Sequence, residues 1–107
     1  MYYIVENTDL MYHITFIQST FAATCATIVS GAIAERCHFN GYIIICSMVT
    51  SVAYPIAAHW CWASEGWLHK KGFRDFAGAG VVHLSGGVIA LVGEYLNSAF
   101  NFCIEIG

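Results

Sequence analysis

Three long stretches of the chain carry almost no charge, and they limit its possible folds more than any other feature. Residues 14–34 and 41–63 contain no Asp, Glu, Lys or Arg, and residues 76–96 contain a single acid, Glu94. Each stretch is long enough to cross a hydrocarbon core of about 30 Å as a helix that rises about 1.5 Å per residue. The sequence therefore predicts an all-α, polytopic membrane protein with three transmembrane helices.

The composition also favours an integral membrane protein over a soluble one. Of the 107 residues, 58% are apolar and 10% are charged, whereas soluble domains carry about 25% charged residues. The net charge is −3 with only four Lys and Arg, so we expect the lipid bilayer as a partner, and not nucleic acid. Residues 1–13 are expected to form a short lead-in, and residues 97–107 a tail too short to span again. The chain reads as one domain or part of one.

Two features of the first two stretches affect helix packing. Ala22, Ala26, Ser30 and Ala34 recur every four residues, and small residues with this spacing let membrane helices approach closely. Pro55 interrupts the second stretch, and because proline lacks a backbone N–H, a kink is predicted there.

Short connections make consecutive helices antiparallel, so the start of the first and third stretches and the end of the second should lie on one side of the membrane. Phe21 in the first stretch, Trp62 at the end of the second and Asp75 before the third all fall on that side. His83 follows, about 12 Å deeper if the helix starts at Asp75. Aromatic faces attract cations, a carboxylate adds to that attraction, and an imidazole can pass on a proton. This arrangement predicts a path for a small protonated solute.

Three motifs carry a resemblance to a known family. They are residues 21–36 (FAATCATIVSGAIAER), residues 59–67 (HWCWASEGW) and residues 75–83 (DFAGAGVVH). In this order and spacing they resemble the third to fifth spans of the ammonium transporter (Amt/Mep/Rh) family, and its Amt branch in particular. The resemblance covers about residues 16–96. It implies an eleven-helix bundle in a homotrimer of the plasma membrane, with a hydrophobic pore for ammonium or ammonia through each subunit.

The resemblance also implies a role for individual residues. Phe21 matches an aromatic gate, Trp62 matches the tryptophan that recruits ammonium by a cation–π contact, and Asp75 matches the acid essential to that site. His83 matches the first of two pore histidines. The second histidine, an outer serine and a second gate phenylalanine belong to family segments that this sequence does not contain, and Glu94 stands where a small or apolar residue is expected. The whole chain, residues 1–107, is therefore expected to be an interior fragment of a transporter domain.

Simpler interpretations of the same residues remain open. Asp75 can cap the third helix at its amino terminus. Trp60 and Trp67 fit an aromatic belt at the membrane interface. His83 can be a packing residue that hydrogen-bonds a neighbouring helix, and Phe21 can be a core residue.

Two other functions compete with transport. A non-transporting membrane protein would associate with full-length subunits and regulate them. A haem module would use His59 and His83 as ligands, although their depths differ by roughly 6 Å if both spans are regular helices. No Gly-x-Ser-x-Gly, His-Glu-x-x-His or P-loop pattern is present, so hydrolytic catalysis has little support and we do not expect an enzyme. For the leading interpretation, transport, we expect no metal and no cofactor.

The distribution of basic residues conflicts with the orientation that the resemblance implies. Lys70, Lys71 and Arg74 lie in the second connection, whereas Arg36 is the basic residue of the first. The positive-inside rule places the second connection in the cytoplasm, and the resemblance places it outside. We follow the resemblance. Arg36 is expected either to form a surface ion pair with Glu35 or to lock the packing on the cytoplasmic side.

Overall fold

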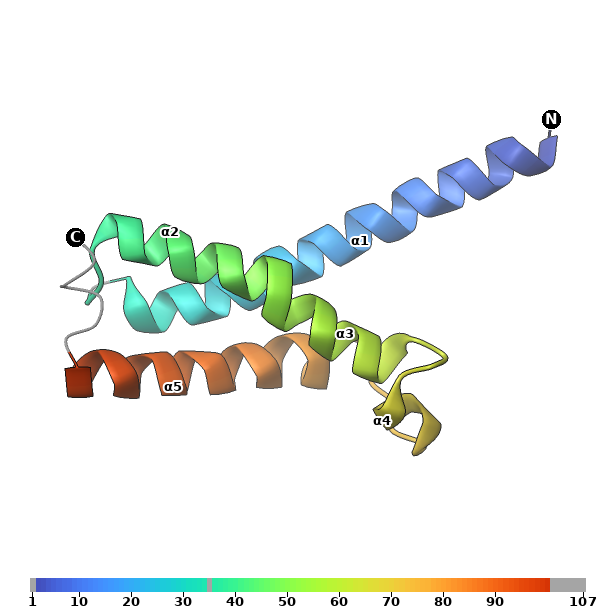
Figure 1. Ribbon diagram of the computed structural model, residues 1–107. Helices are drawn as coiled ribbons and strands as arrows, with labels where there is room; N and C mark the ends of the chain where they lie inside the picture. Colours follow the sequence, from blue (N-terminus) through green and yellow to red (C-terminus); the bar gives the residue numbers. More distant parts are fainter. Residues whose placement is uncertain (1, 35, 101–107) are drawn as a thin grey trace.

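All regular structure in the described part of the chain is helical (Figure 1). The computed structural model describes the backbone of residues 2–34 and 36–100 and the side chains of residues 8–34 and 36–96. From the amino terminus the elements are α1 (Tyr2–Ile33), α2 (Phe39–Met48), the π-helix η1 (Val49–Ala53), α3 (Tyr54–Trp62), the short α4 (Trp67–Lys70), the π-helix η2 (Ala79–Leu84) and α5 (Ser85–Phe100).

Three helical segments are long and apolar enough to cross a membrane. They are Thr8–Ile33, Phe39–Lys70 and Ala79–Leu96. The predicted all-α fold with three spans is therefore confirmed. Figure 1 shows α5 and the second half of α1 running beside the segment formed by α2, η1 and α3, with the amino-terminal half of α1 projecting beyond them.

The ends of the first and third spans differ from the prediction. Residues 2–13 are not a separate lead-in, because α1 begins at Tyr2; this part of the chain contains no Gly or Pro that would end a helix. The third span begins at Ala79, after Gly78 adopts a left-handed backbone conformation with φ of +85°. At its other end, α5 continues into the predicted tail as far as Phe100, and residues 101–107 lie outside the described residues.

The predicted disturbance at Pro55 takes the form of a π-helical turn. The turn η1 ends at Ala53, two residues before Pro55, and the backbone stays helical between them. Pro55 therefore lies inside one continuous helical segment and supplies no N–H to the preceding turn. The Thr50 hydroxyl donates to the Cys46 carbonyl oxygen at 3.0 Å, and the Ser51 hydroxyl donates to the Ser47 carbonyl oxygen. Hydroxyl donors of this kind satisfy carbonyls that an irregular membrane helix would leave unpaired.

The three spans pack through small and β-branched side chains. A Cβ added to Gly86 would lie 3.2 Å from the Cys25 carbonyl oxygen, so this glycine lets α5 approach the backbone of α1. The predicted small-residue face of α1 is only partly correct, because Ala26 is buried whereas Ala34 is exposed. The buried hydrophobic cluster consists of Cys25, Ala26, Val29, Ile33, Val49, Tyr54, Cys61, Val81 and Val82.

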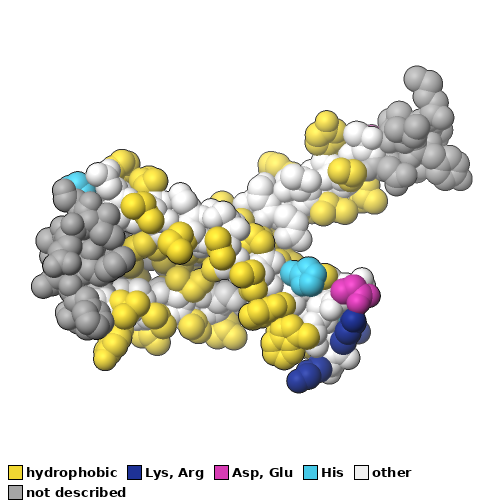
Figure 2. All heavy atoms as spheres, viewed as in Figure 1, with side chains coloured by type: hydrophobic (Ala, Val, Ile, Leu, Met, Phe, Trp, Pro, Cys, Tyr) yellow, Lys and Arg dark blue, Asp and Glu magenta, His cyan; other side chains and the backbone are white. Residues whose placement is uncertain are grey.

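Large hydrophobic side chains cover much of the outer surface. Phe16 on α1 is 73% exposed and Leu91 on α5 is 69% exposed, as expected where lipid or further helices surround a bundle. On the face seen in Figure 2, hydrophobic side chains extend along the helices, whereas Lys, Arg and acidic side chains gather around α4. The candidate site lies at this same end of the bundle.

Candidate functional site

An aromatic pair joins the first and second spans. Phe21 is half-buried on α1, and Trp62 is the last residue of α3. Their ring centroids are 5.6 Å apart and their planes are inclined by 39°. This separation is within the range of favourable aromatic contacts. The structure therefore brings together two of the residues that the sequence analysis selected.

Asp75 links the start of the third span to this aromatic pair. The indole N–H of Trp62 donates a hydrogen bond to the backbone carbonyl oxygen of Asp75 at 2.8 Å. A buried tryptophan N–H normally finds such a partner. Phe21, Trp62 and Asp75 thus form one continuous chain of contacts across three segments that are distant in sequence.

The Asp75 carboxylate itself caps the third span. Its Oδ1 accepts the N–H of Gly78 at 3.0 Å and of Ala79 at 2.9 Å, and its Oδ2 accepts the N–H of Gly80 and of Val81, each at 2.8 Å. These donors belong to the first turn of a helix, which otherwise lacks partners. The capping interpretation of Asp75 is therefore confirmed.

The charge of Asp75 reflects two opposing influences. Partial burial acts to raise its pKa, but the four backbone N–H bonds lower it, and the pKa ends below its ordinary value. Asp75 is consequently ionised at neutral pH. Its charge faces the amino terminus of the third span, and both of its oxygens already have donors.

Two glycines allow the backbone to wrap around this carboxylate. Gly78 has φ of +85°, a conformation that L-residues rarely adopt. A Cβ on Gly80 would lie 3.2 Å from Asp75 Oδ2 and 3.3 Å from the ring of Phe73. The glycines of this motif therefore serve the turn and the cap, and are not only helix-packing residues.

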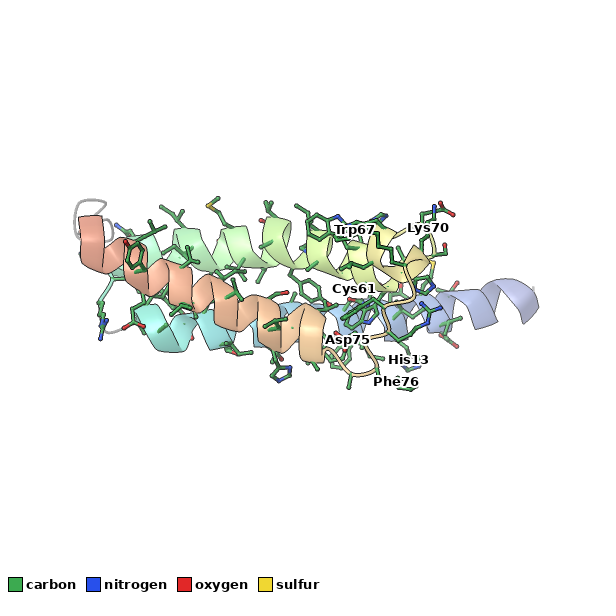
Figure 3. All side chains as sticks on the ribbon, turned by 90° about the horizontal axis from the view of Figure 1, so that it is seen from below. His13, Cys61, Trp67, Lys70, Asp75 and Phe76 are labelled. Carbon is green, nitrogen blue, oxygen red and sulfur yellow. The ribbon has the colours of Figure 1, made fainter. Side chains whose placement is uncertain are left out.

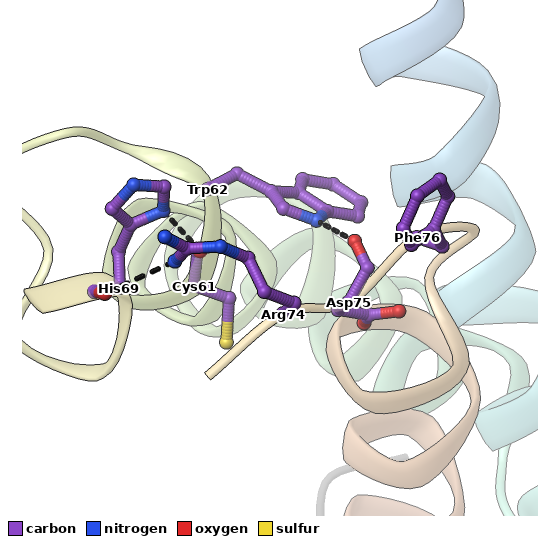
Figure 4. Close-up of a pocket in the computed structure, with 6 residues that line it drawn as sticks. All are labelled: Cys61, Trp62, His69, Arg74, Asp75 and Phe76. Carbon is purple, nitrogen blue, oxygen red and sulfur yellow. Dashed lines mark hydrogen bonds between the residues drawn. The ribbon is translucent and has the colours of Figure 1, made fainter. Parts of the chain in front are cut away.

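A pocket opens beside the Trp62 indole. It has a volume of about 240 Å³ and is lined by Cys61, Trp62, His69, Arg74, Asp75 and Phe76 (Figure 4).

Two polar residues of this pocket were missed by the sequence analysis. Arg74 Nη1 donates to the His69 carbonyl oxygen at 3.1 Å, and His69 Nδ1 lies 3.3 Å from the Cys61 carbonyl oxygen. Their proximity to Trp62 and Asp75 along the chain was the available signal. It was weak, because the turn around α4 decides which side chains face the pocket.

His83 stands apart from the aromatic pair. It is exposed on η2, next to the buried Val81 and Val82, and its Nδ1 lies 3.2 Å from the Gly78 carbonyl oxygen. Among the described residues, no hydrogen bond or ring contact joins it to Phe21 or Trp62. The predicted depth of about 12 Å assumed a regular helix from Asp75, and that assumption is wrong because the helix begins later and opens with a π-turn.

The other tryptophans form a separate contact. Trp60 and Trp67 lie with their ring centroids 5.8 Å apart and nearly edge to face, and both are exposed. This outward placement fits the interfacial belt expected for them.

At the opposite end of the bundle, Glu94 meets Arg36. Arg36 Nη1 lies 2.5 Å from Glu94 Oε1, which connects the α1–α2 turn to α5. Of the two roles expected for Arg36, the ion pair with Glu35 involves a residue outside the described part of the chain, and the packing lock stays a prediction. The unexpected acid in the third span thus has a cationic partner, which reduces the cost of placing its charge near a membrane.

Comparisons with known proteins agree on one family. The sequence profile of the Ammonium Transporter Family matches residues 3–98. The chain is 47% identical over 91 residues to Ammonium transporter Amt2 of Archaeoglobus fulgidus, covering 76% of the chain and 19% of that protein. It is 46% identical over 88 residues to Ammonium transporter 1 member 4 of Arabidopsis thaliana, covering 74% of the chain and 18% of that protein. It is 41% identical over 102 residues to Ammonium transporter 1 member 3 of rice (Oryza sativa subsp. japonica), covering 86% of the chain and 20% of that protein. The chain spans less than a quarter of the length of these relatives. No solved structure matches it significantly.

Proposed function

The chain belongs to the ammonium transporter family, and from this premise we propose that it forms part of a pore that carries ammonium or ammonia across a membrane. The family consists of transporters and not enzymes. Because the chain matches less than a quarter of its relatives, the activity is proposed for a complete transporter that contains these three spans. Residues 1–107 would be one part of a single transporter domain.

The contact between Phe21 and Trp62 is the observation that carries the proposal. The two rings, Phe21 near the middle of α1 and Trp62 at the end of α3, would offer electron-rich faces to a small cation. Such a contact contributes about 0.5–2 kcal/mol depending on desolvation. Ammonium is small enough to approach these rings. We assign recruitment of the substrate to Phe21 and Trp62.

Asp75 supports this site without touching the substrate. Both carboxylate oxygens accept backbone N–H groups, and the backbone carbonyl holds the Trp62 indole. Asp75 would therefore fix the orientation of Trp62 and the start of the third span, while its negative charge attracts a cation from a distance.

His83 would line the path beyond the site. Its side chain lies on the outer surface of the three-span unit, which is where further helices of a complete transporter would close the pore wall. An imidazole at this position can donate or accept a hydrogen bond with ammonia. We propose in addition a homotrimer and a location in the plasma membrane, both on the basis of the family.

A chimeric transporter tests the proposal. Residues 16–96 would replace the matching segment of the Archaeoglobus protein, and methylammonium uptake would be measured in cells that lack their own ammonium transporters. We expect Trp62→Leu to raise the concentration for half-maximal uptake by about 5- to 30-fold, which corresponds to the loss of about 1–2 kcal/mol of cation–π attraction.

The control is Phe16→Leu, compared with Phe21→Leu on the same helix. Phe16 is 73% exposed and has no aromatic partner among the described residues, so its change should leave uptake unaltered. If the Phe16 and Phe21 variants take up methylammonium equally well, and Trp62→Leu leaves the concentration for half-maximal uptake unchanged, Phe21 and Trp62 do not recruit the substrate. Blotting of the native membrane fraction adds an independent check: a product several times heavier than 11.7 kDa supports a complete transporter, and a product near that mass counts against it.

A further inference from the structure

Most of the positive charge of this chain is concentrated at one short turn. Lys70, Lys71 and Arg74 are three of its four basic residues. With Glu65 as the acid of residues 64–74, the formal charge of this segment is +2 (three positive minus one negative), whereas the whole chain carries −3. Figure 2 shows the Lys and Arg side chains grouped around α4, beside hydrophobic side chains.

An exposed aromatic surface adjoins these cations. Trp60 is 43% exposed and Trp67 is 47% exposed, and the two rings contact each other edge to face. Lys71 Nζ lies 5.2 Å from the centroid of the Trp67 ring. In Figure 3, Trp67 and Lys70 lie on one side of the molecule and Asp75 and Phe76 on the other, so this surface is separate from the pocket beside Trp62.

A tight turn holds the tryptophans together. A Cβ on Gly66 would lie 2.3 Å from the His59 carbonyl oxygen, so only glycine fits where the chain folds α4 back onto the end of α3. The Gly66 N–H donates to the Ala63 carbonyl oxygen at 2.9 Å and closes the turn. The turn therefore fixes the backbone path that brings Trp67 next to Trp60.

The three cations differ in their engagement with the protein. Lys70 is paired with Glu65 at 2.6 Å, and one guanidinium nitrogen of Arg74 is bonded to backbone carbonyls. Lys71 rests on the Trp67 ring and makes no ion pair with a described residue. Lys71 is consequently the cation with most capacity to bind an external anion.

We propose that this surface, formed by Trp60, Trp67, Lys70 and Lys71, binds the headgroups of anionic phospholipids, whereas Arg74 lines the separate pocket beside Trp62. The surface lies at the end of the second membrane-spanning segment, at the depth where headgroups meet the hydrocarbon. Tryptophan rings favour this depth, and each Lys or Arg near an anionic bilayer contributes about 1 kcal/mol of attraction. The cations repel ammonium, so the surface is unsuited to the proposed substrate.

The proposal also explains why the basic residues lie where they do. Their number would direct this connection to the cytoplasm, whereas the family resemblance places it outside. Charges that serve to hold lipid phosphate are useful on either side of the membrane. The inference does not depend on transport by this chain.

Fluorescence quenching by brominated lipids tests the proposal on the full chain. The chain with Trp62→Phe, which keeps Trp60 and Trp67 as reporters, would be placed in phosphatidylcholine bilayers that contain one part in four of phosphatidylglycerol. In one sample the phosphatidylglycerol would carry bromine, and in the other an equal mole fraction of the phosphatidylcholine would carry it. We expect stronger quenching of tryptophan fluorescence by the brominated phosphatidylglycerol. The ratio of the two quenching efficiencies measures the preference of this surface for the anionic lipid.

Substitutions then separate the cations. Lys71→Gln should lower the preference about fivefold, the equivalent of about 1 kcal/mol, and Lys71→Arg should keep it. The matched control is Lys70→Gln, which should lower it less than twofold because Lys70 already has a carboxylate partner. Circular dichroism would confirm that each variant keeps its helices.

Several results would overturn the proposal. Equal quenching by the two lipids would exclude a preference, and a preference that survives Lys71→Gln would show that this cation does not bind the headgroup. Displacement of the lipid by millimolar inorganic phosphate would identify a site for free phosphate in its place. If Lys71→Gln loses helix content, the Lys71→Arg variant decides the matter, since loss of the preference despite the retained charge would contradict headgroup attraction.

Discussion

Replacing Asp75 by asparagine removes the charge at the start of the third span while keeping the shape of the side chain. In the folded protein the carboxylate accepts four backbone N–H groups, two on each oxygen. An amide side chain offers one oxygen and one NH₂ group. Asp75→Asn therefore tests whether this cap, more than the apolar sequence that follows, sets the point where the third span begins.

The magnitude follows from counting these bonds. Asn at position 75 can keep its oxygen against the N–H groups of Gly78 and Ala79, but its NH₂ would face the N–H groups of Gly80 and Val81. Two bonds to a charged acceptor, each contributing about 1.5 kcal/mol, are lost. Because Asp75 is only half-buried, water replaces part of the lost bonding. We therefore expect the free energy of local opening at the start of the third span to fall by about 2 kcal/mol, which makes the open state roughly 30-fold more populated.

Amide hydrogen exchange in detergent micelles measures this opening directly. We expect exchange at Gly80 and Val81 to accelerate roughly 30-fold in the Asp75 variant. The control is Glu65→Gln, which removes an exposed carboxylate that pairs with Lys70 and should leave these two amides unchanged. Unchanged exchange at Gly80 and Val81 in Asp75→Asn would refute the assignment of the carboxylate as their acceptor.

The same cap predicts an acid dependence. The pKa of Asp75 is lower in the folded chain than its ordinary value of about 3.9, so folding favours the ionised carboxylate. Its stabilising effect is fully present above the unfolded pKa and disappears as the pH falls through the lowered folded pKa. Protection of the Gly80 and Val81 amides should therefore be constant near neutral pH and decline below about pH 4. A variant with Asp75→Asn should lack this decline.

Three further changes test other contacts through thermal unfolding in detergent. Gly78→Ala forces a side chain into a φ of +85° with its Cβ 2.9 Å from a valine methyl group, and should cost about 1–3 kcal/mol; an unaltered melting temperature would contradict this. Tyr54→Phe removes the hydroxyl that donates to Gln18 Oε1 at 2.5 Å and should lower the free energy of unfolding by about 1 kcal/mol. An unchanged melting temperature would show that this bond between the first and second spans does not form. Glu94→Gln should cost no more than about 1 kcal/mol, because Arg36 and Glu94 are each about half-exposed; a much larger loss would show that solvent does not screen this pair.

Much of the site followed from chain order alone. Once three apolar stretches were joined by short connections, Phe21, Trp62 and Asp75 had to fall on one side of the membrane, and the structure places them in contact. The Asp75 cap was also anticipated, since an acid before a helix commonly accepts its first N–H groups. These features depend on the length of apolar runs and on neighbours in sequence.

Other features required the packed arrangement of the helices. Nothing local to Glu94 pointed to Arg36, 58 positions earlier, because that ion pair arises from the rotation of α5 against α1. The π-turns, and the exposure of His83 beside buried neighbours, likewise depend on how backbone carbonyls and side chains are satisfied between helices. Trp62 bonds the backbone of Asp75 and leaves its carboxylate to the cap. Residue order establishes which groups lie at the same height in the membrane, whereas helix rotation and register determine which atoms meet.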